Sequence, residues 1–277
     1  MTAMSEVILA VVERPEAAAR TLAAASRLAE IIKARRVVVL AIRIPPIATI
    51  MPTEEVLLPD AEIRIRAEEQ ARTAALKRVY EEWTTQAQPV RLATEWCEVE
   101  GRADEVVGDR GRRADYIVLK RPWQRTTGTE RWAIHGALID SDRPVLVVPP
   151  ERPPAPFGRR VAIAWRDDPR TIKAVLAALR WLEQAESVVV LAGAREGRAE
   201  PRLPELLAEH GLRAELHVLA VTGQRVFGEA LLDRAHALGA DMLVLGAYVR
   251  QPVIGMLLGG VTRHMLTHAD LPLLMRH

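Results

Sequence analysis

The chain is predicted to fold as two tandem α/β domains, each with an open parallel sheet between layers of helices. Apolar runs of strand length alternate with segments of helical periodicity, the order that produces right-handed βαβ crossovers. The same order occurs twice, so the chain is interpreted as a tandem duplication. Between the copies, Pro149 to Pro156 is rich in proline and should form a stiff linker. We therefore expect domains at residues 1–150 and 151–277.

The first copy opens with two strands around a helix. Val7 to Val12 and Val37 to Ile42 are unbroken apolar runs, which are typical of strands covered on both faces. Between them, Ala17 to Ala34 places its larger apolar side chains on one helical stripe. Next, Ile44 to Pro52 has too many prolines for a helix or central strand, and Ala61 to Trp83 is expected to be a long charged helix. This insertion is either a surface excursion or a lid over a ligand site.

The second copy repeats this order. It has a strand at Val161 to Trp165, a helix with Ile172 and Val175 on its apolar face, and a strand at Val188 to Leu191.

The closing segments of the two copies also match. Gly239 to Tyr248 is similar to Arg113 to Pro122, and Leu271 to Met275 is similar to Arg143 to Val147. Each copy therefore ends in an apolar strand, and an uncovered strand of this kind invites pairing with its equivalent.

Composition excludes several classes of protein. The 38 basic and 36 acidic residues nearly cancel, so no net field favours nucleic acid or an anionic membrane as a partner. The single cysteine, Cys97, cannot form an internal disulfide, which fits a reducing compartment. No signal peptide and no uncharged apolar run of about 18 residues is present. We expect a soluble, cytoplasmic protein.

Ligands of open parallel sheets bind beyond the carboxyl ends of the strands, so the turns there are the places to search. In the first turn of the second copy, Asp168 is a candidate N-cap with Pro169 as the first helical residue. Asp167 could then accept hydrogen bonds from an adenine amino group or a ribose hydroxyl, although an exposed acid without a role is an equal alternative. In the second turn, small residues around Ala192 would leave room for a flat base.

The third turn is the most specific. A buried strand ends at Gly246, and after a loop a helix begins at Gly259 and Gly260. Unpaired amides of a helix's first turn bind anions, and glycine permits close approach. Thr262 adds a hydroxyl, and Arg250 and Arg263 add positive charge. The alternative is that these glycines only allow tight packing.

At this loop the chain resembles the universal stress protein family. Nucleotide-binding members carry a glycine, two residues, a glycine, nine residues, a glycine and a serine or threonine. Gly246, Val249, Gly259 and Gly260 occupy those places, so the spacing is kept while the second glycine and the hydroxyl are changed. Thr262 is a candidate replacement for the hydroxyl.

The resemblance implies a flavodoxin-like or Rossmann-like fold of the adenine nucleotide alpha hydrolase type and a role in stress tolerance or growth arrest. It also implies a site for ATP or another adenine nucleotide, with or without Mg²⁺, in the second copy. The candidate residues are Asp167, Ala192, Gly246, Arg250, Gly259, Gly260 and Thr262.

The first copy resembles the family in layout only. Lys120 replaces the leading glycine, and Arg131 and Trp132 stand where the closing glycines should be. Bulky side chains would fill the phosphate space, although Lys120, Arg121 and Arg125 could attract another anion. Because family members commonly join subunits through the terminal strand, a tandem chain can pair its two domains internally, and further homodimerisation is plausible.

No catalytic constellation is visible: the chain lacks a Gly-x-Ser-x-Gly elbow, a P-loop lysine signature and an HExxH motif. His264 and His268 are only two possible metal ligands. We expect a nucleotide-binding sensor rather than an enzyme. A slow ATP hydrolase and a ligand-free interaction scaffold remain as alternatives.

Overall fold

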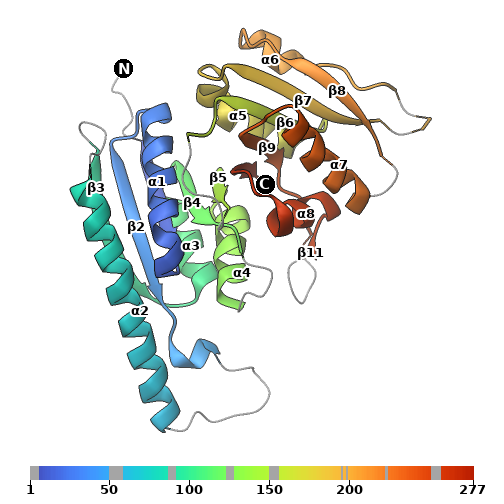
Figure 1. The fold of residues 1–277 in the computed structure, drawn as a ribbon. Coiled ribbons are helices and arrows are strands. Elements are labelled where there is room, and N and C mark those ends of the chain that lie inside the picture. The colour runs from blue at the N-terminus through green and yellow to red at the C-terminus, as the bar shows by residue number, and fades with distance from the viewer. Residues whose placement is uncertain are drawn as a thin grey trace. The chain divides into compact units, whose positions relative to one another are not determined.

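The computed structural model describes residues 6–49, 59–86, 92–122, 128–149, 156–194, 196–197, 199–221, 224–250 and 257–277. The chain divides into two compact units, Met1–Arg143 and Pro144–His277. Each unit has the predicted arrangement of a parallel sheet with helices on both faces (Figure 1).

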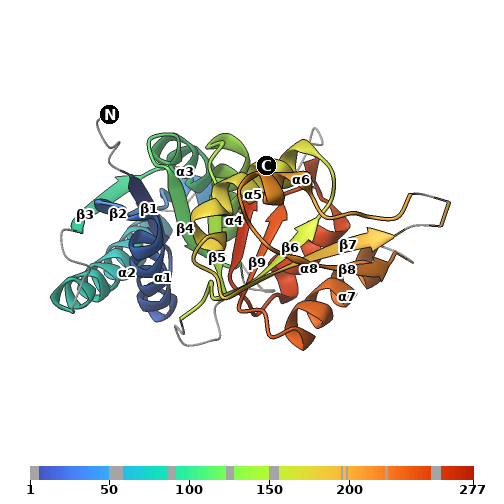
Figure 2. The same cartoon turned by 90° about the horizontal axis from the view of Figure 1, so that it is seen from above.

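The sheet of the first unit has the order β3-β2-β1-β4 and is parallel throughout. Its strands are β1 (Val7–Val12), β2 (Arg36–Arg43), β3 (Ala93–Glu100) and β4 (Tyr116–Lys120). Its helices are α1 (Pro15–Ile32), the 3-10 turn η1 (Pro46–Thr49), α2 (Pro59–Thr85), α3 (Ala103–Gly111), α4 (Gly128–His135) and the π-helical turn η2 (Gly136–Asp140). Helices α1 and α2 cover one face of the sheet, and α3 and α4 cover the other (Figure 2).

The first strands and helix lie where the sequence predicts them. Strand β1 is central and almost fully buried, because helices cover both faces of the sheet. In α1, Leu22, Leu28 and Ile32 are at most 2% exposed, so the predicted apolar stripe faces the core.

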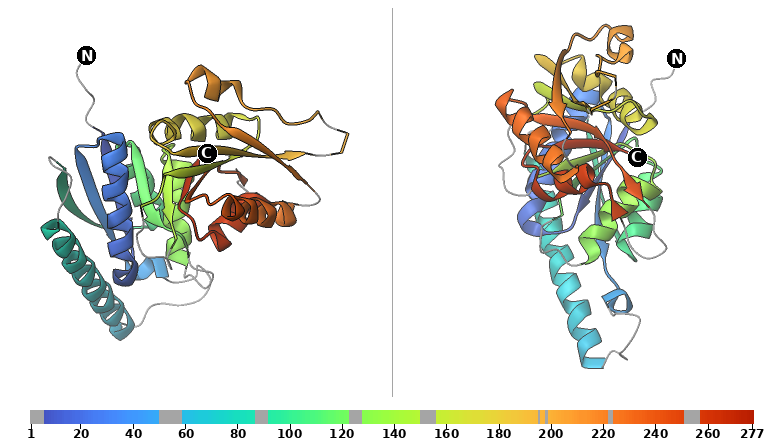
Figure 3. Two further views of the ribbon diagram at one scale, coloured as in Figure 1. Left: turned by 45° about the horizontal axis from the view of Figure 1, so that its top comes forward. Right: turned by 90° about the vertical axis from the view of Figure 1, so that its right-hand side faces the viewer.

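The predicted charged helix is α2, which packs on α1 and β2 of its own unit. Leu76 and Trp83 anchor it, being 0% and 4% exposed. Its first turns extend past the end of the sheet (Figures 1 and 3). The remaining residues of the predicted loop, 50–52, lie outside the described ranges.

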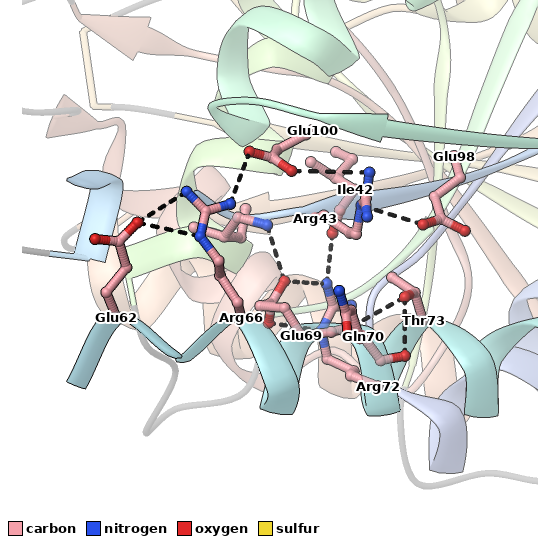
Figure 4. A network of polar contacts seen from close by, with 11 residues as sticks. Ile42, Arg43, Glu62, Arg66, Glu69, Gln70, Arg72, Thr73, Glu98 and Glu100 are labelled. Atoms are coloured by element: carbon pink, nitrogen blue, oxygen red, sulfur yellow. Dashed lines mark hydrogen bonds and ion pairs between the residues drawn. The ribbon is translucent and has the colours of Figure 1, made fainter. Parts of the chain in front are cut away.

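Polar contacts fix α2 to the sheet edge. Arg72 Nη1 donates to the Glu13 carbonyl at 2.7 Å, and Arg72 also donates to the carbonyl of Ile42. Glu69 pairs with Arg72 at 2.7 Å and accepts from the amide of Ile44 at 2.8 Å. Figure 4 shows Glu69 and Arg72 between the helix and the strands. The helix is therefore tied to the carboxyl ends of β1 and β2.

The sheet of the second unit has the order β5-β12-β9-β6-β7-β8. Its strands are β5 (Val145–Val148), β6 (Arg160–Trp165), β7 (Ser187–Ala194), β8 (Glu215–Ala220), β9 (Met242–Gly246) and β12 (Leu273–Arg276), with a separate ribbon of β10 (Val249–Arg250) and β11 (Leu257–Leu258). Its helices are α5 (Pro169–Leu182), α6 (Glu205–Glu209), α7 (Gln224–Ala237) and α8 (Gly260–His268). Helices α5 and α6 lie on one face, and α7 and α8 on the other (Figure 2).

Strand β5 closes the first copy in the sequence but belongs to the second unit. It pairs antiparallel with β12, with Leu146 opposite Leu274, whereas the other strands of this sheet run parallel to one another. The units therefore divide before β5, ahead of the proline-rich segment. Within the described ranges, no helix has the length and apolar character needed to cross a membrane.

Candidate functional site

A pocket of about 1250 Å³ opens beyond the carboxyl ends of β6 and β7. Strand β6 lies between β9 and β7, so the order of strands reverses there. The ligand crevice of an open parallel sheet forms at such a reversal. One wall is built from Trp165, Asp167 and Ile172, and the facing wall from residues 199–206 and Glu209.

The turn after β6 positions Asp167. Asp168 Oδ1 accepts hydrogen bonds from the amides of Arg170 (2.9 Å) and Thr171 (3.1 Å). With Pro169 as the first helical residue, this confirms the predicted N-cap of α5. The neighbouring Asp167 is exposed and lines the pocket. The N-cap thus holds the adjacent carboxylate at the pocket wall.

The turn after β7 is more filled than its small residues suggest. Ala192 lines the pocket but is only 1% exposed. A Cβ added to Gly193 would lie 2.6 Å from the Val221 side chain and 2.7 Å from the Phe227 ring. The space expected for a base against the Gly193 backbone is therefore taken by these two side chains, which themselves line the pocket.

The glycine loop forms a separate cluster around Tyr248. The Gly259 amide donates to the Tyr248 carbonyl at 2.7 Å, and the Tyr248 amide donates to Thr262 Oγ1 at 3.0 Å. Thr262 is 1% exposed. Gly246, Gly259 and Thr262 are not among the described residues that line the pocket.

Two of these glycines have packing roles. A Cβ on Gly246 would lie 2.9 Å from the Thr171 amide nitrogen, so glycine lets β9 approach the first turn of α5. A Cβ on Gly259 would lie 3.0 Å from Tyr248 Cβ. The packing alternative therefore has direct support at both positions. Gly260 begins α8, and the Arg250 side chain lies outside the described part of the structure.

Tyr248 was not predicted to take part in the site. The Arg166 guanidinium lies 4.7 Å from its ring centroid and that of Arg170 lies 5.5 Å away. Arg166 also pairs with Asp168 at 3.2 Å and lines the pocket, so it connects the pocket to the glycine loop. The available sequence signal was an aromatic residue two positions after the leading glycine.

The facing wall of the pocket was also missed. Pro201, Leu203 and Pro204 precede the short helix α6, and no motif marks them. Two prolines around an apolar residue were the only signal, and they indicate an ordered loop rather than a ligand site.

In the first unit, an ion-paired cluster lies at the carboxyl end of β4. Lys120, which replaces the leading glycine, pairs with Glu130 Oε1 at 2.6 Å, and the two side chains are 5% and 3% exposed. Arg14 Nε lies 2.5 Å from the same oxygen. Lys120 and Glu130 thus fill this place, in line with the expected loss of the phosphate space. Arg131 and Trp132, which align with the closing glycines, do not fill it as expected, because both side chains are exposed, Trp132 by 43%. Arg125 lies outside the described residues.

Glu13 completes this cluster. It precedes Arg14 at the end of β1, as Asp167 precedes Asp168 after β6. Burial of its carboxyl, and next the neighbouring Glu130, raise the pKa of Glu13 from 4.5 to about 7, while Lys120, Arg72 and Arg14 oppose this shift.

The paired histidines of α8 stack on each other. The rings of His264 and His268 have centroids 4.5 Å apart. Among the described residues, no group of three or more His, Cys, Asp or Glu side chains is arranged to hold a metal ion.

The second unit is thus an α/β domain of doubly wound topology with a pocket at the strand reversal. The sequence model of the universal stress protein family matches residues 166–277. This part of the chain is a universal stress protein domain.

Two solved structures show the same fold over nearly the whole chain. A universal stress protein from Archaeoglobus fulgidus is 11% identical, has a TM-score of 0.66, and is aligned over 98% of this chain and 95% of its own. A Pseudomonas aeruginosa protein assigned provisionally to the universal stress proteins is 14% identical, with a TM-score of 0.60 and 99% and 93% coverage. No curated protein sequence matches the chain.

Proposed function

We propose that the chain is a tandem universal stress protein whose second unit binds an adenine nucleotide as a stress-response sensor. The first unit would support this function without binding a nucleotide. The observation that carries the proposal is the pocket at the β6 and β7 carboxyl ends, with Asp167 at its wall. Its mixture of apolar surface and a carboxylate suits a purine with an exocyclic amino group and ribose hydroxyls.

The contacts of Gly259 and Thr262 within the protein favour one competing function, that of a ligand-free scaffold. Thr262 is buried and its hydroxyl accepts the Tyr248 amide, so it is committed within the protein. The adenine end of a nucleotide fits the described residues, whereas a phosphate cradle at Gly259 and Thr262 does not. If Mg²⁺ accompanies the nucleotide, it would enter with the phosphates.

Mass spectrometry of gently denatured protein, combined with titration calorimetry, tests the proposal. We expect a copurified adenine compound, or heat on titration with one. Asp167→Asn should weaken binding about tenfold, because one of the two carboxylate oxygens that can accept from the ligand is replaced by an amide donor and the negative charge is removed. Glu81→Gln, on the exposed face of α2, is the matched control and should have no effect. No release and no heat would favour the scaffold, and product formation with Mg²⁺ would favour a hydrolase.

A further inference from the structure

The pocket carries more negative than positive charge. Two guanidinium groups line it, while four carboxylates do so. The groups are Arg166 and Arg202, against Asp167, Glu200, Glu205 and Glu209. Three of the four carboxylates belong to the wall formed by residues 199–209, and all three are exposed.

One of the two cations is already engaged by the protein. Arg166 is paired with Asp168 at 3.2 Å and stacks on the Tyr248 ring at 4.7 Å. Its charge is therefore partly balanced before any ligand binds, and the excess of negative charge that a ligand meets is larger than the count of side chains indicates.

The described groups of the glycine loop that are candidates to contact phosphates are engaged within the protein. The Gly259 amide is used by the Tyr248 carbonyl, and Thr262 Oγ1 by the Tyr248 amide. Thr171 closes the space above Gly246. Three of the groups that would contact phosphates in this loop instead hold the protein together.

The remaining lining suits an uncharged planar group. Trp165, Ile172 and Phe227 present apolar surface beside the polar wall. Burial of a base against such side chains contributes affinity without a charged partner.

We propose that this pocket selects an adenine nucleoside with one phosphate or none and discriminates against ATP. The proposal rests on the proposed function and names the ligand class of the same site. Selection follows from repulsion between the carboxylates of the 199–209 wall and the added phosphates.

Calorimetric titration with adenosine, AMP, ADP and ATP, at low and high salt and with and without Mg²⁺, tests this inference. Affinity should fall as phosphates are added, and ATP should bind about tenfold more weakly than adenosine at low salt, because each added phosphate increases the repulsion from the carboxylates. Because salt screens repulsion, the affinity for ATP should rise with salt, whereas a site that attracts phosphates would lose affinity.

A variant carrying both Glu205→Gln and Glu209→Gln isolates the charge effect. The ratio of its affinity for ATP to its affinity for adenosine should rise about threefold, because only the phosphates are repelled by the removed charges. If no adenine compound binds, the proposed function fails. If one binds but ATP equals or exceeds adenosine, with or without Mg²⁺, the function stands and the selection is overturned.

Discussion

The two units differ in the side chains that occupy the carboxyl end of corresponding strands, β4 in the first unit and β9 in the second. At the end of β4 in the first unit, Lys120 and Glu130 form a buried ion pair. At the end of β9 in the second unit, Gly246 admits Thr171, and Tyr248 packs on Gly259. A buried ion pair is stable only while both charges are present. An aromatic ring packed on glycine is stable as long as no added side-chain atoms occupy the space between them. The first unit should therefore be sensitive to charge and the second to volume.

The largest effect is expected from breaking the ion pair. Lys120→Met leaves the buried Glu130 with Arg14 as its remaining cation among the described ion pairs, and should destabilise the first unit by about 3–5 kcal/mol. Hydrogen exchange in β1 and β4 would measure it. The control Arg64→Met removes an exposed pair with Glu68 and should cost less than about 1 kcal/mol. Equal effects would contradict the importance of burial.

The next effect is a pH dependence confined to the first unit. Since the pKa of Glu13 is raised from 4.5 to about 7, the folded state binds this proton more tightly than the unfolded state does. The free energy of unfolding should therefore fall as pH rises from 4.5 to 7, by roughly 2–3 kcal/mol, and then level off. Glu13→Gln should remove the slope. An unchanged slope in that variant would assign it to other groups.

Adding side-chain volume at Gly246 or Gly259 should destabilise the second unit. Gly246→Ala places a methyl group 2.9 Å from the Thr171 amide nitrogen, where backbone must move, and should destabilise the second unit by about 2 kcal/mol. Gly259→Ala meets Tyr248 Cβ at 3.0 Å and should cost about 1 kcal/mol. Hydrogen exchange in β9 would test both. A neutral Gly246→Ala would show that the close approach relaxes freely.

The smallest effect concerns the helix starts after the first strand of each unit. Asp168 caps α5 through its side chain, whereas Arg14 at the start of α1 makes no side-chain cap bond. Asp168→Ala should therefore cost about 1 kcal/mol. Loss of amide protection confined to the first turn of α5 is the expected signature, and unfolding of all of α5 would contradict it.

Much of the fold follows from local pattern. The apolar runs of β1 and β6 and the stripe of α1 specify burial directly, and Asp168 with Pro169 specifies a helix start. These features depend on residues that are close together in the sequence, so they can be predicted from it directly.

The site was less predictable because it depends on distant contacts. Nothing near Gly193 indicates that Phe227 would cover it, and nothing near Tyr248 indicates that Arg166 and Arg170 would stack on its ring. Glycines at family spacing are compatible with both an anion cradle and close packing. Only the positions of Tyr248 and Thr171 distinguish these uses.

The pairing of β5 with β12 has a practical consequence for dissecting the chain. A fragment beginning at residue 151 would lack β5 and leave β12 as a bare apolar edge, inviting self-association. A fragment beginning at Pro144 would retain β5, which pairs with β12. In that fragment β5 becomes the edge strand in place of β12, so light scattering on the two fragments would show which of these two apolar strands drives self-association of the isolated unit.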